Sequence, residues 1–374
     1  MSDESLPQSD QIDGAPHPRE TLQLFGQDAA QQGFLEVFNA GRLHHGWLLT
    51  GPRGIGKATL AWQIARFLIA TPKEDDAGLF GAPPKPTSLA IDLEHPVARR
   101  IQAGSEPGLV TIKRPYDEKT KKFKAQITVD EVRRLKNFFA LSAADGGHRV
   151  VIVDAADDMN TSAANALLKL LEEPPADTTL LLISHQPSRL LSTIRSRCRE
   201  LRLAPLSPSD MAAALEQADP GEVAPPELAE LSGGSVGEAI RLAHSGGPAL
   251  YAQLVALFAG MPRPDRQAAM TIAEYAAQPG QSDRLDHILN LIDLFLLRLV
   301  RAGATGQPPL VEAAPNEANV LAQLARAPAH ARAWADVAQE ISARSRHGKS
   351  VNLDPAALVL DTVWKIQNTA QRLT

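Results

Sequence analysis

The residues of this chain best suited to chemistry form one glycine-rich run, Gly51-Pro52-Arg53-Gly54-Ile55-Gly56-Lys57-Ala58. This run matches the phosphate-binding pattern G-x-x-x-x-G-K-[ST] except at its end, where Ala58 stands in place of a hydroxyl residue. In such a loop, backbone N–H groups surround phosphates, the lysine contacts them, and the hydroxyl binds Mg²⁺. Thr59 comes one residue too late for the motif and is expected to point elsewhere on the helix. The candidate nucleotide site therefore comprises Gly51, Gly54, Gly56, Lys57 and Thr59, together with Asp154.

Asp154 follows the apolar run Val150–Val153, which is typical of a buried strand. In hydrolytic loop ATPases an aspartate at this position helps to hold Mg²⁺, and a carboxylate beside it commonly polarises the attacking water. Here the neighbour is Ala155, while Asp157 falls beyond the strand, where a capping or turn role is expected. The losses at Ala58 and Ala155 predict a site that binds ATP or ADP, if at all, without hydrolysis.

A third candidate is Arg197, in the run Ile194-Arg195-Ser196-Arg197-Cys198 between a predicted helix and a predicted strand. An arginine there either favours the helix C-terminus or enters a neighbouring subunit and stabilises charge on a phosphate during transfer. The residues alone leave both roles open. Cys198 is expected to be a small buried hydrophobic residue.

The elements that position these residues alternate between strands and helices up to residue 203, which predicts a parallel sheet covered on both faces. Strands are expected at 47–50, 109–113, 123–128, 149–154, 180–184 and 200–203, and helices at 59–70, 129–141, 162–173 and from 185 to about 197. Beyond Pro205 we expect short helices at 209–217, 226–232 and 237–244, and long ones at 282–301, 327–345 and 354–371. The fold class is therefore an α/β P-loop domain, a small helical lid and an all-α C-terminal domain.

At 374 residues the chain is expected to hold two or three domains. We place a disordered tail at 1–19, the α/β domain at 20–204, the lid at 205–247 and the helical C-terminal domain at 248–374. No uncharged apolar run reaches the roughly 18 residues of a membrane span, and the polar, acidic N-terminus lacks a secretory signal pattern. The single cysteine excludes an intrachain disulfide and indicates the cytoplasm.

The net charge of −5, from 43 acidic and 38 basic residues, argues against a basic nucleic-acid binder. Basic residues do cluster at 113–114, 119–124 and 133–136. Such clusters are more often solvated surface than nucleic-acid sites, so a DNA-binding module remains the weaker alternative.

The order of several motifs resembles that of the AAA+ clamp-loader family of bacterial DNA polymerase III. After Gly51–Lys57 come Ile127–Arg133, the string Asn165–Pro175 and Ser196-Arg197-Cys198. The resemblance covers about residues 20–245 with specific motifs and the helical remainder by architecture. It implies an α/β P-loop (AAA+) domain and a C-terminal collar that serves oligomerisation.

In that family the ATPase subunits carry the loop hydroxyl, an Asp-Glu pair and a lid arginine. The resemblance places the missing groups at Ala58, Ala155 and Gly237, and Arg241 lies one helical turn further on. This pattern implies the non-hydrolysing subunit, a stator that offers Arg197 to ATP on a neighbour. The alternative is an active ATPase subunit that uses Thr59, Asp157 or Arg241.

The implied partners are the ATPase (gamma/tau) and delta subunits, with the sliding clamp and primed DNA reached through the complex. The chain itself would then have no ATPase activity while being part of the DNA polymerase III holoenzyme. Many relatives carry a four-cysteine zinc module after the loop. With Cys198 alone this chain cannot build it, so we expect no zinc, and segment 71–108 either packs without metal or has little fixed structure.

Overall fold

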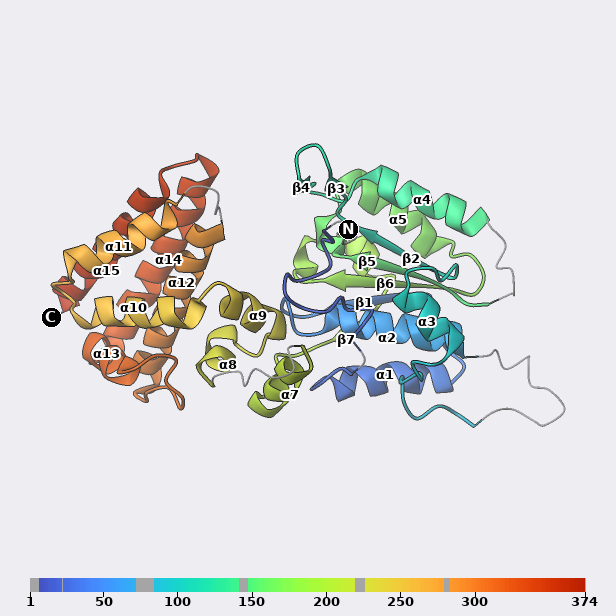
Figure 1. The fold of residues 1–374 in the computed structure, drawn as a ribbon, viewed down its shortest axis with the longest axis horizontal. Coiled ribbons are helices and arrows are strands. Elements are labelled where there is room, and N and C mark those ends of the chain that lie inside the picture. The colour runs from blue at the N-terminus through green and yellow to red at the C-terminus, as the bar shows by residue number, and fades with distance from the viewer. Residues whose placement is uncertain are drawn as a thin grey trace, which may run out of the picture. The chain divides into compact units, whose positions relative to one another are not determined.

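The computed structural model describes residues 7–21, 23–71, 84–140, 147–218, 226–278 and 283–373. The chain forms two compact units: Met1–Val223 with Gly234–Ile240, and Ala224–Gly233 with Arg241–Thr374. The first contains the sheet, and the second is built from helices over the part that the structure describes (Figure 1). Each unit is described by itself below.

The main sheet has five strands in the order β2-β5-β6-β1-β7, and every pairing between them is parallel. Their bounds are β1 Gly46–Thr50, β2 Leu109–Lys113, β5 Arg149–Asp154, β6 Thr178–Ser184 and β7 Arg199–Arg202. All residues of β1 and β6 are buried, as expected for strands covered on both faces. Because the strands are parallel, their carboxyl ends lie along one edge, where open α/β sheets bind ligands.

Helices cover both faces of this sheet (Figure 1). The first unit includes α1 Asp28–Asn39, α2 Lys57–Ala70, α3 Pro96–Gln102, α4 Val129–Ala140, α5 Thr161–Glu172, the single turn α6 Ser192–Arg195, and α7 Pro208–Ala218. On one face, Leu135 of α4 and Leu167 of α5 pack into a buried cluster with Val151 and Val153 of β5. The start of α5 is fixed by Asn160, whose side chain accepts a hydrogen bond from the N–H of Ala163.

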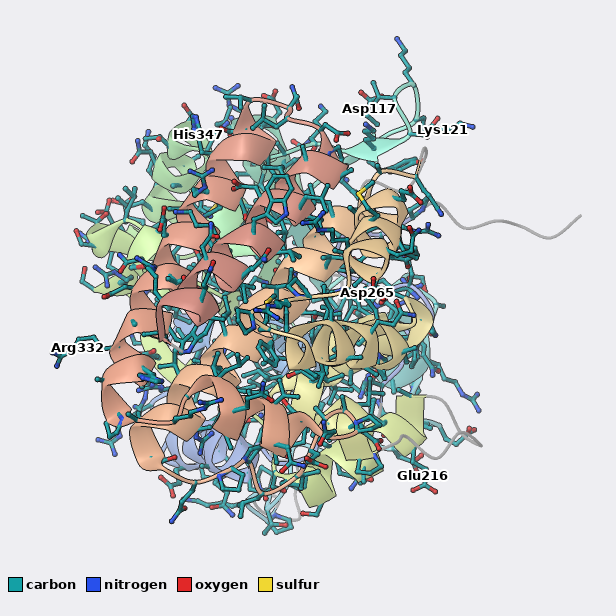
Figure 2. All side chains as sticks on the ribbon, turned by 90° about the vertical axis from the view of Figure 1, so that its left-hand side faces the viewer. Asp117, Lys121, Glu216, Asp265, Arg332 and His347 are labelled. Carbon is teal, nitrogen blue, oxygen red and sulfur yellow. The ribbon has the colours of Figure 1, made fainter. Side chains whose placement is uncertain are left out.

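Two predicted elements were wrong. The strand expected at 123–128 is only the second arm of a short hairpin, β3 Tyr116–Asp117 and β4 Lys122–Phe123, whose turn has Lys121 at φ 51°. The buried Ile127 makes one isolated bridge to Met159 and extends no strand. Figure 2 shows the side chains of Asp117 and Lys121 projecting from this hairpin.

The helix expected from 185 to about 197 is also broken. Its place is taken by a 3₁₀ turn at Pro187–Arg189 and by α6, with Leu190 and Leu191 in extended conformations between them. Leu190 is buried there, so the chain dips into the core instead of continuing a helix. The remaining predicted strands and helices agree with the structure to within a few residues.

The N-terminal segment differs from the expected disordered tail over residues 7–19. The Asp10 side chain is 2% exposed, beside Lys113. His17 is buried, with its ring edge-on to Trp62. Arg66 donates a hydrogen bond to the carbonyl of Arg19 at 2.8 Å. These contacts within the first unit supply the ordering that the segment's polar composition does not reveal; residues 1–6 lie outside the described part.

The second unit contains α8 Pro226–Ser232, α10 Gly247–Ala259, α11 Arg266–Ala276, α12 Asp283–Thr305, α13 Glu317–Leu324, α14 Pro328–Ser350 and α15 Pro355–Leu373. Its core includes the ring contact between Phe258 and Phe295 and the fully buried Trp334. Helix α9, Val236–His244, is divided between the two units, as is the predicted lid, so the lid boundaries at 205 and 247 stay a prediction. No helix in the described part of the chain has the length and apolarity needed to cross a membrane.

Candidate functional site

The glycine-rich loop connects the end of β1 to the start of α2, at the carboxyl edge of the sheet. Its glycines lie in the left-handed region, with φ of 137° at Gly51, 77° at Gly54 and 99° at Gly56. A Cβ on Gly51 would lie 2.6 Å from the carbonyl oxygen of Leu203, and one on Gly56 would lie 2.5 Å from Leu24 Cδ1. The loop conformation therefore requires glycine for both backbone and packing reasons.

Lys57, the first residue of α2, is 3% exposed. Its Nζ donates to the carbonyl oxygen of Gly51 at 2.6 Å and to that of Pro52. Removal from water lowers the pKa of Lys57 to about 8, a drop that the negative charges of Asp154 and Asp157 limit. The ammonium is thus turned toward carbonyls of its own loop, and it must leave them to contact a phosphate.

Ala58 and Thr59 are the second and third residues of α2. Successive helical residues are about 100° apart, so Thr59 lies about 100° around the helix axis from Ala58, the position of the missing hydroxyl. Ala58 offers no ligand atom to a metal.

Asp154 ends β5 and faces Lys113, the last residue of β2, in the strand register. Removal from water, followed by the negative charge of Asp10, raises the pKa of Asp154 to about 7, against the positive charges of Lys57, Lys113 and Arg53. Its neighbour Ala155 is buried and carries no base. The structure thus brings Asp154 close enough to Lys57 for electrostatic interaction, but supplies no second carboxylate at position 155.

Asp157, the alternative carboxylate, already accepts three hydrogen bonds. It accepts from Ser184 Oγ at 2.6 Å, from the N–H of Gln186 at 3.1 Å and from the N–H of His185. Its carboxylate therefore fixes the chain where β6 ends. Asp158 forms an ion pair with Arg114 at 3.1 Å.

The first turn of α9 packs directly on the loop. Ser235 Oγ donates to the carbonyl of Arg53 at 2.8 Å, and the N–H of Gly237 donates to the carbonyl of Gly54 at 3.0 Å. A Cβ on Gly237 would lie 2.9 Å from the Cα of Gly54. The position where the resemblance implies a lid arginine is therefore a close backbone contact with room for glycine alone. Arg241 belongs to the part of α9 in the second unit.

Arg197 lies at the opposite end of β1 from the loop. Its carbonyl is 3.2 Å from where a Cβ on Gly46, the first residue of β1, would stand. The loop follows Thr50, about 13 Å further along the strand. Arg197 Nη2 pairs with Glu172 Oε1 at 2.8 Å, and its Nη1 donates to the carbonyl of Thr193 at 3.1 Å. The structure therefore separates Arg197 from the chain's own phosphate loop and leaves its side chain 38% exposed.

Cys198, next to Arg197, is a partly buried thiol whose pKa is raised by burial to about 12. A thiol with such a pKa stays protonated at neutral pH and is a poor nucleophile. This agrees with a packing role.

Several basic residues of the candidate DNA surface are paired within the chain: Lys113 with Asp10, Arg114 with Asp158, Arg133 with Asp130, and Arg134 with Glu131. These pairs reduce the net positive charge available to a phosphate backbone. They weaken the reading of a free-standing DNA-binding module.

The sequence does not predict the partners of two residues at the site. Asp10 falls in the predicted tail, whereas the structure pairs it with Lys113 at the end of β2. Glu172 belongs to a sequence motif, whereas the structure pairs it with Arg197. The sequence does place Glu172 at the predicted end of a helix, just before Pro174-Pro175, but it does not indicate the partner. For Asp10 it gives no signal, because its partner lies 103 positions away.

A parallel sheet whose first strand leads through a glycine loop into a helix, with Asp154 ending another strand of the sheet, defines an α/β protein of the P-loop class. Residues 26–207 match the family model described as "DNA polymerase III, delta subunit". Over this part the chain is similar to that family, and delta prime subunits are among its relatives. The expected resemblance and the expected α/β fold with a helical C-terminal region are confirmed.

The chain is 41% identical over 216 residues to DNA polymerase III subunit delta' of Pseudomonas aeruginosa, covering 56% of this chain and 59% of the relative. It is 34% identical over 168 residues to that of Escherichia coli, covering 45% of each. It is 27% identical over 194 residues to the gamma subunit of Buchnera aphidicola, covering 52% of this chain and 47% of the relative. The chain thus matches about half the length of these curated relatives.

Among solved structures, a DNA polymerase III gamma subunit-related protein of Thermotoga maritima aligns over 90% of this chain and 99% of its own, with a TM-score of 0.37 and 16% identity. The RuvB Holliday junction branch migration motor of the same organism aligns over 79% and 87%, with a TM-score of 0.39 and 18% identity. Similarities at this level add nothing to the assignment.

Proposed function

We propose that this chain is a non-hydrolysing clamp-loader subunit of DNA polymerase III that supplies Arg197 to ATP bound on a neighbouring subunit. The observation that carries the proposal is that the phosphate loop and Arg197 lie at opposite ends of β1 in one domain. The loop with Lys57 lacks a metal ligand and a base, whereas Arg197 lies at the far end of β1, out of reach of that loop.

Phosphoryl transfer needs a bound Mg²⁺, an oriented nucleophile and positive charge on the transferred phosphate. Ala58 and Ala155 remove the metal-ligating hydroxyl and the neighbouring carboxylate, and the close contact of Gly237 with Gly54 leaves no room for a lid arginine. The geometry supports a chain that does not hydrolyse ATP by itself. Its chemical contribution is one arginine.

Arg197 has the properties that an arginine finger requires. Its guanidinium is planar, permanently charged and partly exposed, and its partner Glu172 is 43% exposed. Exposed ion pairs contribute about 0–1 kcal/mol, so a phosphate can replace Glu172 at small cost. In this proposal the pair holds the side chain near its working position until a neighbouring subunit brings ATP.

The proposed neighbours are the gamma/tau and delta subunits, with the sliding clamp and primed DNA engaged through the complex. Names of relatives support membership of DNA polymerase III. The helical second unit exposes large apolar side chains, among them Leu297 at 64% and Trp364 at 59%. We assign this unit to oligomerisation, as the collar of the complex. The proposal requires neither zinc nor hydrolysis at the loop.

The test is ATP turnover by the complex reconstituted with Arg197→Ala, beside Arg195→Ala as a control for an exposed arginine two positions away. Loss of an arginine finger costs about 10³-fold or more at the affected site. We therefore expect the Arg197 variant to assemble normally but to lose turnover at that site and clamp loading on primed DNA. Equal turnover in both variants would contradict the finger role.

The competing function is an active ATPase subunit of the same complex. Its base would have to be Asp157, whose carboxylate already accepts three hydrogen bonds. Hydrolysis by the purified chain decides the matter, with Lys57→Ala as the matched inactive variant. Turnover that disappears with Lys57 would favour the ATPase reading.

A further inference from the structure

Residues 7–17, here called the N-terminal strap, lie along the carboxyl edge of the main sheet. The dark-blue trace in Figure 1 follows this edge. At the end of β2, Lys113 Nζ donates to Gln8 Oε1 at 2.7 Å, and Ser9 Oγ donates to the carbonyl of Arg114 at 3.0 Å. The strap is thus anchored where a parallel sheet of this kind presents its ligand site.

Asp10 places a buried negative charge at the same edge. Its Oδ1 accepts from Lys113 Nζ at 2.5 Å, and its Oδ2 lies 3.3 Å from His17 Nε2. Removal from water acts to raise the pKa of Asp10, but the contact with His17 and the charge of Lys113 outweigh it and hold the pKa at about 2. Asp10 is therefore ionised at physiological pH, and its charge reaches Asp154, the residue at the metal-holding position of the fold.

Ile12 carries the strap across to the phosphate loop. A Cβ on Gly237 would lie 2.5 Å from Ile12 Cδ1, and the same glycine donates its N–H to Gly54 in the loop. Strap, first turn of α9 and phosphate loop therefore form one packed stack. Within it, Lys57 is bonded to the carbonyls of Gly51 and Pro52.

From this arrangement we infer that the N-terminal strap is an internal plug that closes the degenerate nucleotide site against nucleoside triphosphates. Three features oppose a polyphosphate there. Asp10 adds a fixed negative charge that acts on Asp154, the Asp10 carboxylate pairs with Lys113, and Ile12 covers the turn of α9 on the loop. Entry of a triphosphate requires the strap to leave and Lys57 to be released.

The fraction of molecules with an open strap sets how much the strap weakens nucleotide binding. Apparent affinity falls by the fraction of molecules that can bind, so a strap open in about 1% of molecules weakens binding about 100-fold. The inference concerns the isolated chain and does not depend on Arg197. Its failure would leave the finger proposal untouched.

The experiment is a fluorescence titration of the purified chain with a fluorescent ATP analogue, without partners. Four proteins are compared: the full chain, a truncation that lacks residues 1–16, the double variant Asp10→Ala/Ile12→Ala, and the control Asp13→Ala. Asp13 is an exposed acidic residue of the same strap. The truncation retains His17 because it packs on Trp62.

We expect the truncation and the double variant to bind at least tenfold more tightly than the full chain and the Asp13 variant. Lys57→Ala should abolish this gain, which places the added binding at the phosphate loop. Equal affinity of the full chain and the opened variants would overturn the inference, and so would a gain that survives Lys57→Ala.

Hydrogen exchange on the unmodified chain keeps the inference testable if the truncated chain does not fold. The N–H of Gln11 donates to the carbonyl of Gln8 at 3.2 Å, and that of Ala15 donates to Ile12 at 3.0 Å. Slow exchange of these two amides is expected from a closed strap. Exchange as fast as in an unfolded peptide would overturn the inference.

Discussion

Arg197 Nη2 and Glu172 Oε1 lie 2.8 Å apart, so the last residue of α5 forms an ion pair with the second residue after α6. Both side chains are partly exposed, at 38% and 43%. Arg197 is therefore fixed by a contact that water and other anions can replace. This distinguishes it from the ion pair between Arg298, whose side chain is 11% exposed, and the fully buried Glu317.

Glu172→Gln should change the free energy of unfolding by less than about 1 kcal/mol, because exposed ion pairs contribute little to stability. Urea denaturation of the purified chain measures this, and Arg197→Ala should have an equally small effect. A loss well above that size in both variants would mean that the pair has a structural role, which would argue against release of Arg197 to a neighbour.

The pH dependence of stability should report on Asp154. Its pKa is raised from 3.8 to about 7, so between these values the folded chain binds more protons than the unfolded one. Stability contributed by the protonated carboxyl is present below pH 3.8 and is lost as the pH rises toward 7. Asp154→Asn should therefore be more stable than the unmodified chain by about 1–3 kcal/mol at pH 8.

Near pH 4 the two proteins should differ much less, so urea unfolding at both pH values isolates the effect. Asp177→Asn provides a control, since Asp177 is an exposed aspartate in the turn before β6. A stability difference that stays constant between pH 4 and pH 8 would show that titration of Asp154 is not its source.

Local patterns explain which parts of the fold the sequence predicts. The strands β1, β5 and β6 are nearly continuous apolar runs because both faces of the sheet are covered. The loop with Lys57 is positioned by the strand before it and the helix after it, so chain continuity alone places it at the carboxyl edge. Lys57 and Asp154 could be assigned to one edge for the same reason.

Contacts between distant segments leave no comparable pattern. Gly237 contacts Gly54 through backbone atoms, and its role is visible only once the α9 turn is seen to pack on the loop. The strap looks disordered because its composition is polar, while the residues that order it belong to β2 and α2. The helix predicted near Pro187 does not form for a similar reason. Tertiary packing, which leaves no local pattern, decides that Leu190 is buried there.

Glu317 is a buried charge of the second unit. It is fully buried and accepts hydrogen bonds from Arg298, from Tyr251 at 2.6 Å and from the N–H of Ala313 at 2.7 Å. Burial and the charge of Glu317 raise the pKa of Tyr251, which keeps its hydroxyl protonated as a donor. Glu317→Ala would leave the largely buried Arg298 with Glu230 as its remaining carboxylate partner and should cost about 3–5 kcal/mol.

Urea unfolding followed by far-ultraviolet circular dichroism measures the loss. Glu274→Ala is the control, because Glu274 is exposed on α11 and surface substitutions change stability by about 0.5 kcal/mol or less. Equal stability of the two variants would contradict the assigned role of Glu317 in holding α12 to α13.

Introducing at Gly237 the lid arginine that the resemblance implies for ATPase subunits should damage the site instead of activating it. A Cβ at this position would lie 2.9 Å from Gly54 Cα and 2.5 Å from Ile12 Cδ1, so Gly237→Arg must displace backbone. Forcing atoms into a packed contact typically costs about 1–3 kcal/mol.

Gly147→Arg is the matched control, since nothing lies within 4 Å of a Cβ there. We expect urea unfolding to show that loss for Gly237→Arg and little change for Gly147→Arg. Gly237→Arg should gain no ATP hydrolysis, because the hydroxyl at position 58 and the carboxylate at position 155 remain absent. Unchanged stability or measurable turnover in Gly237→Arg would show that the α9 turn can leave the loop at little cost.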